Sequence, residues 1–443
     1  MNHEPVRAAA DRRTIRGIVD WMLRPRSFRP SYGALACAFV AIGVALRIWE
    51  YFEFRQIYMD EGSLLKNIVG RSIFDFRHVL EDDQMAPPAF LVIERLLVRL
   101  PMSVKAAGRL FPLLCGVATV FLTYAAARRY LDPRAVPIAV ALFALSDHLL
   151  YYSAEIKQYS CDLMFSLIAI LLAAPPPPGE MGPQKFRALA VFGLVAPWFS
   201  FPVVFALAAV GSQILLNRLR LKERGAAIRM TAIGLAWVAS FAGCYLLSRS
   251  ILSRRDFIWV WWNFAFLPIP PRSLAELSLL GETFANVFIN PVGILSPLPL
   301  PYTAALASIL WLFGAFSLGL RWPGGLLIVA GPLPLALASS ALHLYPFHGR
   351  LLIYLVPALL LPMAEGMAAI GRRTGWPATL LLATLFIYGE AAEIFWHKTI
   401  LARARTFDSH GDLKNDLLDH LEYQRKKEAE ARLRAATARD PSR

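Results

Sequence analysis

Residues 33–51 read GALACAFVAIGVALRIWEY, an apolar run long enough to cross a lipid bilayer as one helix. Similar runs recur along the 443-residue chain, in which 56% of the residues are hydrophobic and only 18% are charged. Soluble domains of this length do not carry repeated apolar runs of about 18 or more residues. The sequence therefore predicts an all-α, polytopic membrane protein.

Apolar windows predict about 11 transmembrane helices on this reasoning. The predicted segments are 33–51, 109–127, 135–152, 159–174, 187–200, 202–217, 229–248, 303–320, 324–342, 351–370 and 377–396. The formal net charge of +14 would suggest nucleic acid in a soluble protein, but here the arginines stand beside the ends of the apolar runs. That placement sets topology and contacts lipid phosphates, so we expect membrane lipids and no nucleic acid as partners.

Positive charge in alternate loops fixes the predicted orientation. The arginines of residues 1–32 keep this basic N-terminus cytoplasmic, and Arg128-Arg129 and Arg372-Arg373 mark later cytoplasmic turns. Residues 33–396 form the predicted transmembrane domain, and residues 397–443 a charged helical tail. Compact loops and the lack of endoplasmic-reticulum signals favour a bacterial inner (plasma) membrane.

Two large outer loops follow from this orientation. The first spans residues 52–108, and its segments 62–80 and 87–100 (PPAFLVIERLLVRL) are amphipathic, so we expect interfacial helices on the outer leaflet. The second spans residues 249–302 and carries a tryptophan cluster at 259–262. That cluster favours a headgroup belt, with a sugar-stacking platform as the alternative.

Chemistry-bearing residues gather on the outer side. The acidic doublet Asp60-Glu61 opens the first loop, and carboxylates held at a bilayer edge are costly enough to favour a functional role. Three other clusters share this side: Asp82-Asp83-Gln84, the segment 151–159 and the segment 345–350. A carboxylate can take a proton from an acceptor, and cations can stabilise a departing phosphate. The combination indicates group transfer from a lipid-linked phosphate.

The order of these motifs resembles the GT-C glycosyltransferases, and in particular protein O-mannosyltransferases and aminoarabinose (lipid A) transferases. The motifs are outer Asp60-Glu61, then Pro87-Pro88, Arg109-Leu-Phe-Pro112, YSAEIKQY at 152–159 and PFHGR at 346–350. The resemblance implies that Asp60 is the catalytic base and Glu61 its partner in the acceptor or sugar site. It assigns the donor phosphate to Glu155, Lys157, Tyr159 and Arg350. Gln84, His348 and Arg109 are added as candidate substrate-binding residues.

The sequence departs from the family pattern at three places. Lys157 stands where relatives have arginine, which keeps the charge but loses bidentate geometry. Ala86 precedes the proline pair where relatives often have His or Lys, and Ser200 stands where many carry His. These departures leave the sugar and the acceptor undetermined.

Structural readings of the same residues remain open. Asp60 suits a helix N-cap and Glu61 suits the helix dipole, while Arg350 could anchor a helix end. Glu81, Asp82 and Asp83 form an acidic run that could hold a divalent cation, although a solvated turn is favoured. The four cysteines and the pair His343 and His348 do not have the spacing of a metal site, so none is expected.

We therefore expect an inverting membrane glycosyltransferase that moves a sugar from a polyprenyl-phosphate donor to a protein, lipid or glycan acceptor. Its active site would face the periplasmic or extracellular side. One alternative is a carrier or flippase for a lipid-linked sugar, and another is an oligosaccharide transferase or ligase that uses a diphosphate-linked donor. Ionisable residues lie near the ends of the predicted spans rather than at their middles, which disfavours the carrier.

Overall fold

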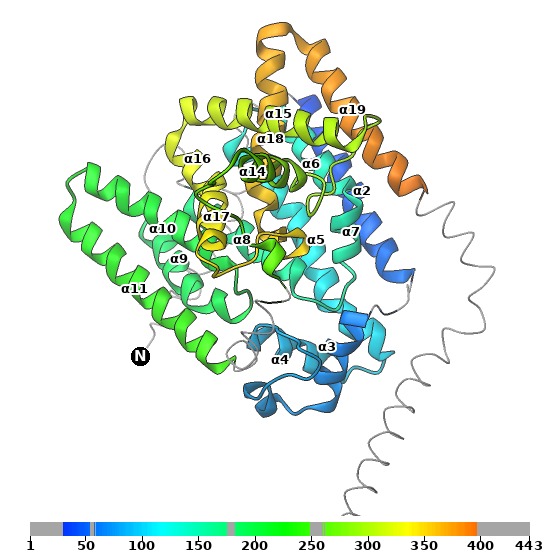
Figure 1. Ribbon diagram of the computed structural model, residues 1–443, viewed down its shortest axis with the longest axis vertical. Helices are drawn as coiled ribbons and strands as arrows, with labels where there is room; N and C mark the ends of the chain where they lie inside the picture. The colour runs from blue at the N-terminus through cyan, green and yellow to red at the C-terminus, as the bar shows by residue number, and fades with distance from the viewer. Residues whose placement is uncertain are drawn as a thin grey trace, which may run out of the picture. The chain divides into compact units, whose positions relative to one another are not determined.

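The computed structural model describes residues 30–53, 57, 59–174, 182–248, 260 and 262–396 (Figure 1). These residues form α-helices and short 3-10 helices, and the described part contains no β-strand. The chain divides into two units, residues 1–390 and 391–443. The described helices belong to the first unit, apart from the last residues of α19 (Trp376–Phe395). Most of the predicted N-terminal region, the predicted tail at 397–443 and two tryptophans of the second outer loop, Trp259 and Trp261, lie outside the described residues.

Within the described residues, seven helical stretches are long and apolar enough to cross a membrane. They are α2 (Pro30–Phe52), α5 (Val104–Tyr130), α10 (Val203–Arg220), α11 (Arg224–Leu247), α15 (Leu300–Arg321), η4 (Gly349–Leu355) with α18 (Val356–Thr374), and α19 (Trp376–Phe395). The pair α16 (Pro323–Ala330) and α17 (Pro332–Ala341) is bent by 47° and makes an eighth if it counts as one span. A polytopic all-α membrane protein is therefore confirmed.

The predicted count of about 11 spans is not confirmed, because several helical segments are short or broken. Helix α8 (Tyr159–Ala173) has 15 residues, about 22 Å at 1.5 Å per residue, and α9 (Pro183–Val195) is shorter. The predicted segment 135–152 is split into α6 (Ala135–Leu145) and α7 (Asp147–Tyr152). Ser146 lies at the break, and its hydroxyl accepts a hydrogen bond from the backbone N–H of Leu149, which caps the new helix.

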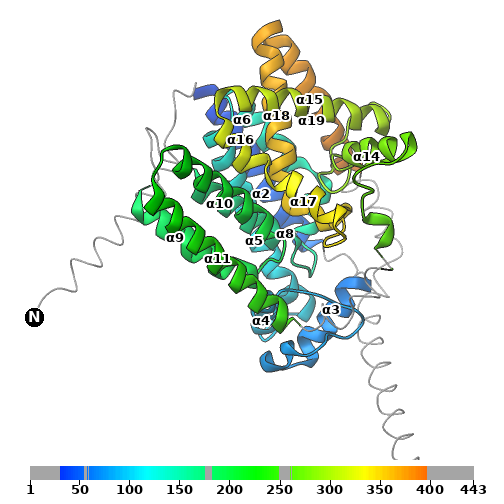
Figure 2. The ribbon, with the colours of Figure 1, turned by 60° about the vertical axis from the view of Figure 1, so that its left-hand side comes forward.

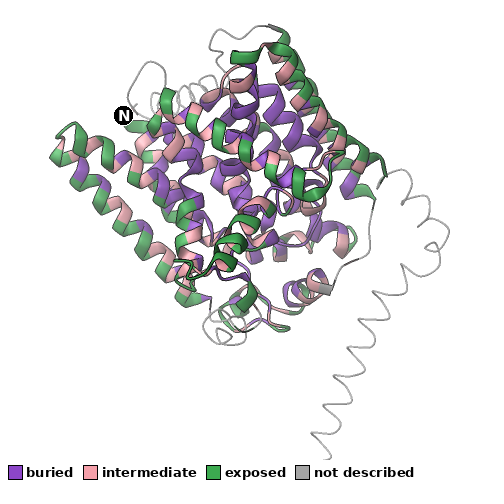
Figure 3. Ribbon diagram, turned by 45° about the horizontal axis from the view of Figure 1, so that its top comes forward, coloured by how far each residue is buried: buried purple, intermediate pink, exposed green. Residues whose placement is uncertain are grey.

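Helix α18 is the centre of the bundle. In an 18-residue apolar segment of the stretch formed by η4 and α18, 94% of the residues are buried. This stretch packs against α15, α6 and α8. Figure 3 shows the buried residues concentrated on these inner helices. A Cβ on Gly314 would lie 1.7 Å from the Pro362 carbonyl oxygen, and one on Gly366 would lie 1.9 Å from that of Leu310. Helices α15 and α18 therefore touch backbone to backbone at these glycines.

The first outer loop folds as a small helical unit against the beginning of α5. It contains α3 (Met59–Gly70), η1 (Ile73–Arg77) and α4 (Pro88–Leu97), and α3 and α4 lie together in both views (Figures 1 and 2). Leu64, Ile68 and Phe90 form its core, which continues onto Cys115 of α5. Helices are thus present in both predicted segments, although the first, 62–80, is divided after Gly70 into α3 and η1. Their placement on the outer leaflet stays a prediction.

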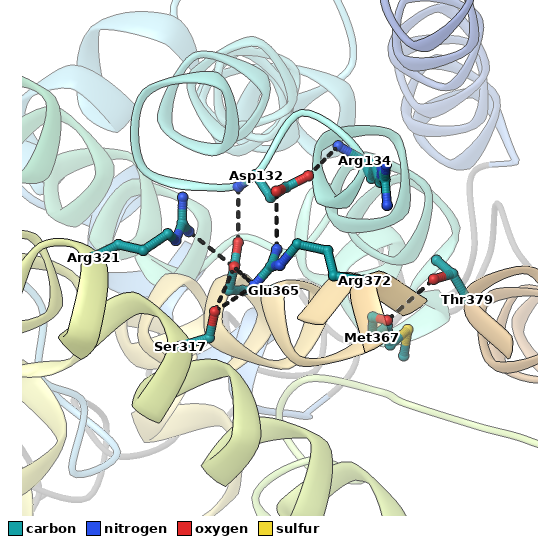
Figure 4. Close-up of polar contacts among 8 residues, drawn as sticks. All are labelled: Asp132, Arg134, Ser317, Arg321, Glu365, Met367, Arg372 and Thr379. Carbon is teal, nitrogen blue, oxygen red and sulfur yellow. Dashed lines mark hydrogen bonds and ion pairs between the residues drawn. The ribbon is translucent and has the colours of Figure 1, made fainter. Parts of the chain in front are cut away.

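A cluster of charges lies near the C-terminal ends of α5 and α18 (Figure 4). The carboxylate of Glu365 is fully buried and accepts hydrogen bonds from the Asp132 backbone N–H at 2.8 Å and the Ser317 hydroxyl at 2.9 Å. Arg321 and Arg372 pair with the same carboxylate at 2.9 and 3.2 Å. This cluster joins the turn after α5 to α15 and α18.

Candidate active site

Asp60 and Glu61 occupy the first turn of α3, where negative side chains suit the positive end of the helix dipole. Their side chains point to different partners. Asp60 remains 30% exposed and forms an ion pair with Arg350, whose side chain is exposed to the same extent. Residues 290 positions apart therefore meet, because η4 begins the central span beside the small unit of the first outer loop.

Glu61 is fully buried and is held by Arg109 of α5, which is 1% exposed. The Arg109 Nη2 atom donates to both carboxylate oxygens at 3.0 and 3.1 Å, and Nε donates to Oε1 at 3.3 Å. The backbone N–H of Ile156 donates to Oε1 at 3.0 Å. Several charge-assisted hydrogen bonds compensate this buried pair, which joins α3 to α5 and to the turn at 153–158.

Lys157 extends from the same turn toward Gln84 of the first outer loop. Its ammonium is 6% exposed and donates to the Gln84 Oε1 atom at 2.5 Å. Burial lowers the pKa of Lys157 to about 8, although the nearby carboxylates of Asp60 and Glu155 favour its charged form. The ammonium is therefore predominantly charged at neutral pH and loses its proton within the range that an assay can reach.

Tyr159 and Glu155 complete the cluster. The guanidinium of Arg350 lies 5.9 Å from the centre of the Tyr159 ring, a cation–π arrangement that fixes the arginine on one side. Glu155 is fully buried and is an electrostatic neighbour of both Lys157 and Arg350. Three acids (Asp60, Glu61 and Glu155) thus stand beside three bases (Arg109, Lys157 and Arg350), for a formal net charge of zero.

This arrangement separates the residues by what they can do. Asp60 is a partly exposed carboxylate, so it can meet a second molecule and accept a proton. Lys157 and Arg350 supply positive charge beside it, suitable for a phosphate. Glu61 was predicted as the partner of the base and Arg109 as a substrate-binding residue. In the structure these two side chains contact each other in the interior.

His348 packs on a different surface from the ion pairs, although it lies only two residues before Arg350. Its ring centre is 5.1 Å from that of Phe264 and 6.1 Å from that of Trp262, both in the second outer loop. The backbone N–H of Phe347 donates to the carbonyl of Ala265 at 2.8 Å and fixes the two segments together. Partial desolvation lowers the pKa of the exposed His348 and favours its neutral ring.

The acidic run at 81–83 is built as a turn. Glu81 pairs with Lys66 at 2.7 Å and with Arg71 at 3.6 Å, which occupies its carboxylate. Within the part of the chain that the structure describes, no three His, Cys, Asp or Glu side chains are grouped so that they could hold a metal ion. The divalent cation that the sequence left open therefore has no identified site among those residues.

Two residues near the site were missed by the sequence reasoning. Asn67 is 2% exposed in the middle of α3, and its amide bonds to the turn at residue 81. Asparagine is unfavourable inside helices because its side chain competes for backbone groups, so its position was an available signal. Glu94 of α4 is fully buried, and neither carboxylate oxygen has a hydrogen-bond partner. Its hydrophobic neighbours in PPAFLVIERLL suggested only an amphipathic surface helix.

No protein-family model matches the chain. No curated protein sequence matches it either. Among solved structures, it is similar to ArnT from Cupriavidus metallidurans bound to undecaprenyl phosphate, with a TM-score of 0.50 and 14% identity. The match covers 78% of this chain and 62% of ArnT, so the chain spans less than two thirds of that protein. The oligosaccharyltransferase AglB from Archaeoglobus fulgidus, in complex with an inhibitory peptide and a dolichol-phosphate, matches at TM-score 0.45 and 14% identity, over 84% of this chain and 55% of AglB.

The similarity to ArnT concerns the fold. The arrangement of its helices is similar to that of ArnT, in agreement with the fold implied by the resemblance of its outer-face motifs. At 14% identity, the roles of individual residues must be argued from their own geometry.

Proposed function

We propose that the protein is an inverting membrane glycosyltransferase that uses a polyprenyl-phosphate-linked sugar as its donor. The observation that carries the proposal is the ion pair between Asp60 and Arg350 beside the buried ammonium of Lys157. A proton acceptor and two phosphate-binding cations are thereby adjacent at one end of a membrane bundle. The similarity to an ArnT structure bound to undecaprenyl phosphate supports the choice of a lipid phosphate.

In the proposed reaction, the Asp60 carboxylate takes the proton of an acceptor hydroxyl or amine. The acceptor oxygen or nitrogen attacks the anomeric carbon of the donor sugar from the face opposite the phosphate. The bond from that carbon to the phosphate oxygen breaks, and its electron pair leaves with the lipid phosphate. Lys157 and Arg350 stabilise the negative charge that develops there, and the configuration at the anomeric carbon inverts.

Arg350 links the two halves of this reaction. Its guanidinium pairs with Asp60, and the same donors are the ones a phosphate would engage. A bound donor phosphate therefore competes with Asp60 for Arg350, and the carboxylate becomes more basic toward the acceptor as the arginine turns to the phosphate. On this proposal, the donor must bind before the acceptor is deprotonated.

The length of the central helix supports placement of the site at the outer surface of the inner membrane. About 35 Å of helix separates Arg350 from Arg372, because the 3-10 helix that ends at Leu355 rises about 2.0 Å per residue and the α-helix after it about 1.5 Å. That length is close to the hydrocarbon thickness of about 30 Å. Because the basic loops belong on the cytoplasmic side, the cluster around Arg372 would face the cytoplasm and the site around Asp60 the periplasmic or extracellular side of the inner membrane.

The acceptor would be a protein, a lipid or a glycan that presents a hydroxyl or amine to Asp60. A first experiment compares surface glycans, by mass spectrometry, in cells with and without the protein and in cells carrying D60N. The Asn side chain keeps the shape of Asp but cannot accept a proton in the same way, so the glycan should disappear in D60N cells. D75N, in an exposed acid of η1 in the same loop, is the matched control and should leave the glycan unchanged. A full glycan signal in D60N cells contradicts the assigned base.

The two alternative functions are separated in proteoliposomes. A carrier would move the lipid-linked sugar across the bilayer without forming a glycosidic product. An enzyme for diphosphate-linked donors would accept a polyprenyl-diphosphate sugar and reject the monophosphate. The proposal requires product formation from the monophosphate donor, and that product must vanish in D60N.

A further inference from the structure

We infer that Gln84 is a positioning residue, which acts by holding the Lys157 ammonium at a fixed place relative to Asp60. The inference rests on the proposed function in one respect, the role of Lys157 as a phosphate-binding group. Gln84 belongs to a strap, defined as residues 81–84, that joins α3 to the turn bearing Lys157.

The strap is fastened to α3 by Asn67. The backbone N–H of Glu81 donates to the Asn67 Oδ1 atom at 2.8 Å, and the Asn67 Nδ2 atom donates back to the Glu81 carbonyl at 3.1 Å. The same Nδ2 atom donates to the carbonyl of Ser63 at 2.8 Å, one turn earlier in the helix. Because both polar ends of the amide are used, Asn67 fixes the position and the direction of the strap.

The strap then reverses through two residues in the left-handed region. Asp82 has φ of 57° and Asp83 has φ of 54°, a conformation that aspartate tolerates better than most residues. The Gln84 Nε2 atom donates to the carbonyl of Asp82 at 3.0 Å. With its NH₂ group engaged there, the amide must direct its Oε1 atom elsewhere, and that atom accepts the hydrogen bond from Lys157.

The contacts close a ring that returns to α3. On one side, Asn67 holds the strap, and on the other, Glu61 accepts the backbone N–H of Ile156, the residue before Lys157. Asn67 and Glu61 lie on α3, the helix that carries Asp60 in its first turn. The ammonium of Lys157 is therefore held from two directions by the helix that carries the proposed base.

An amide suits this task better than a carboxylate. The carbonyl oxygen of Gln84 stabilises the ammonium without cancelling its charge, so the full positive charge remains for a phosphate. The charged groups around Lys157 are Asp60, Glu61, Glu155 and Arg350. Since burial already disfavours the charged lysine, loss of the amide acceptor should make it release its proton at lower pH.

The test compares Q84M and Q84E with the wild-type protein in nanodiscs between pH 6 and 9. Two properties are measured: binding of undecaprenyl phosphate, and the rate at which a small amine-reactive reagent labels Lys157, read by mass spectrometry. Q84M keeps the length and removes the acceptor, so binding at pH 8 should weaken on the order of tenfold, as expected for a lost hydrogen bond to a charged group. The alkaline limb of binding and the onset of labelling should both move to lower pH.

Q84E should move both properties the other way, because a carboxylate raises the pKa of a neighbouring ammonium. It should also weaken binding near pH 7, where its negative charge cancels that of the lysine. N67L releases the strap without touching Lys157, and it should reproduce the direction seen in Q84M. Should Q84M fail to fold, Q84N replaces it, because its shorter amide cannot keep both contacts.

The inference is overturned if Q84M and Q84E lower binding equally at every pH and leave the labelling profile of Lys157 in place. That pattern would make Gln84 only a structural residue. A different result concerns the proposed function: K157M that binds undecaprenyl phosphate like the wild type removes Lys157 from the phosphate site. The labelling profile still tests the positioning role in that case, so the two failures can be told apart.

Discussion

Replacing Asp60 by asparagine should abolish sugar transfer and yet strengthen binding of the lipid phosphate. In the structure, the carboxylate of Asp60 occupies Arg350, which the proposed reaction assigns to the phosphate. D60N releases the guanidinium and removes a negative charge from beside the phosphate. A variant that is catalytically dead would then hold its carrier more tightly than the active protein.

The expected gain is moderate because the pair is not fully buried. Both side chains are 30% exposed, so solvent screens their attraction, and ion pairs of this kind contribute about 1 kcal/mol at most. A release of about 1 kcal/mol corresponds to about fivefold tighter binding. Asp60 also raises the pKa of Lys157, which burial has lowered to about 8, so D60N makes that lysine lose its proton at lower pH. The gain should therefore be clear at pH 6.5 and shrink toward pH 8.5.

The assay is titration of undecaprenyl phosphate into nanodisc-embedded protein at these two pH values and at two salt concentrations. A double-mutant cycle supplies the control, because D60N should bring a smaller gain when Arg350 is already replaced by methionine and only the removal of the negative charge acts. Weaker or unchanged binding by D60N at pH 6.5 would refute the competition for Arg350. An equal gain with and without Arg350 would assign the effect to general charge removal.

Three further predictions concern stability. R109M leaves Glu61 buried without its partner and should lower the free energy of unfolding by about 3–5 kcal/mol in chemical denaturation. The double variant R109M/E61L should recover part of that loss. An equal loss in both variants would contradict the pairing. Burial raises the pKa of Glu94 well above its usual value of 4.5, so the folded protein favours the protonated carboxyl. The contribution of this group to the free energy of unfolding is therefore fully present below pH 4.5 and is lost as the pH rises through the folded-state pKa. E94Q should thus match the wild type near pH 4 and exceed it at pH 8 in thermal unfolding, and a constant difference at both pH values would be the wrong outcome. G366A should destabilise the contact of α18 with α15 by about 1–3 kcal/mol or more, because its Cβ meets the Leu310 carbonyl, while G225A, which has open space, should not.

The fold was largely predictable because membrane insertion is decided by local composition. Apolar length identified the long helices of the bundle, such as 33–51 and 229–248, but not α14 (Leu274–Asn286), which lies within the predicted second outer loop. The number of spans was harder to predict, since Ser146, followed by the polar Asp147 and His148, divides the predicted segment 135–152 into two helices. Helix α8 shows the same limit, because its length depends on where the turn at 153–158 ends.

The membership of the site was easier to predict than its pairings. The motif order gathered Asp60, Lys157 and Arg350 on one side, and they are neighbours in the structure. Which acid meets which base depends on packing between segments 48 to 290 residues apart, and no local pattern encodes it. Hence Glu61 and Arg109 were expected to face substrate, whereas the structure turns them toward each other in the core.

The pairing of Asp60 with Arg350 also explains how a partly buried site tolerates the charge movement in the proposed reaction. Before transfer, Asp60 carries one negative charge and the donor, a phosphodiester, carries another. After transfer, Asp60 holds the acceptor proton and is neutral, while the released phosphate monoester has gained the charge that Asp60 lost. The total is unchanged, so charge moves from one side of Arg350 to the other within a cluster whose formal sum is zero. Separating charge in a medium of low dielectric is costly, and a guanidinium that lies between the two anions and turns from one to the other keeps that separation short.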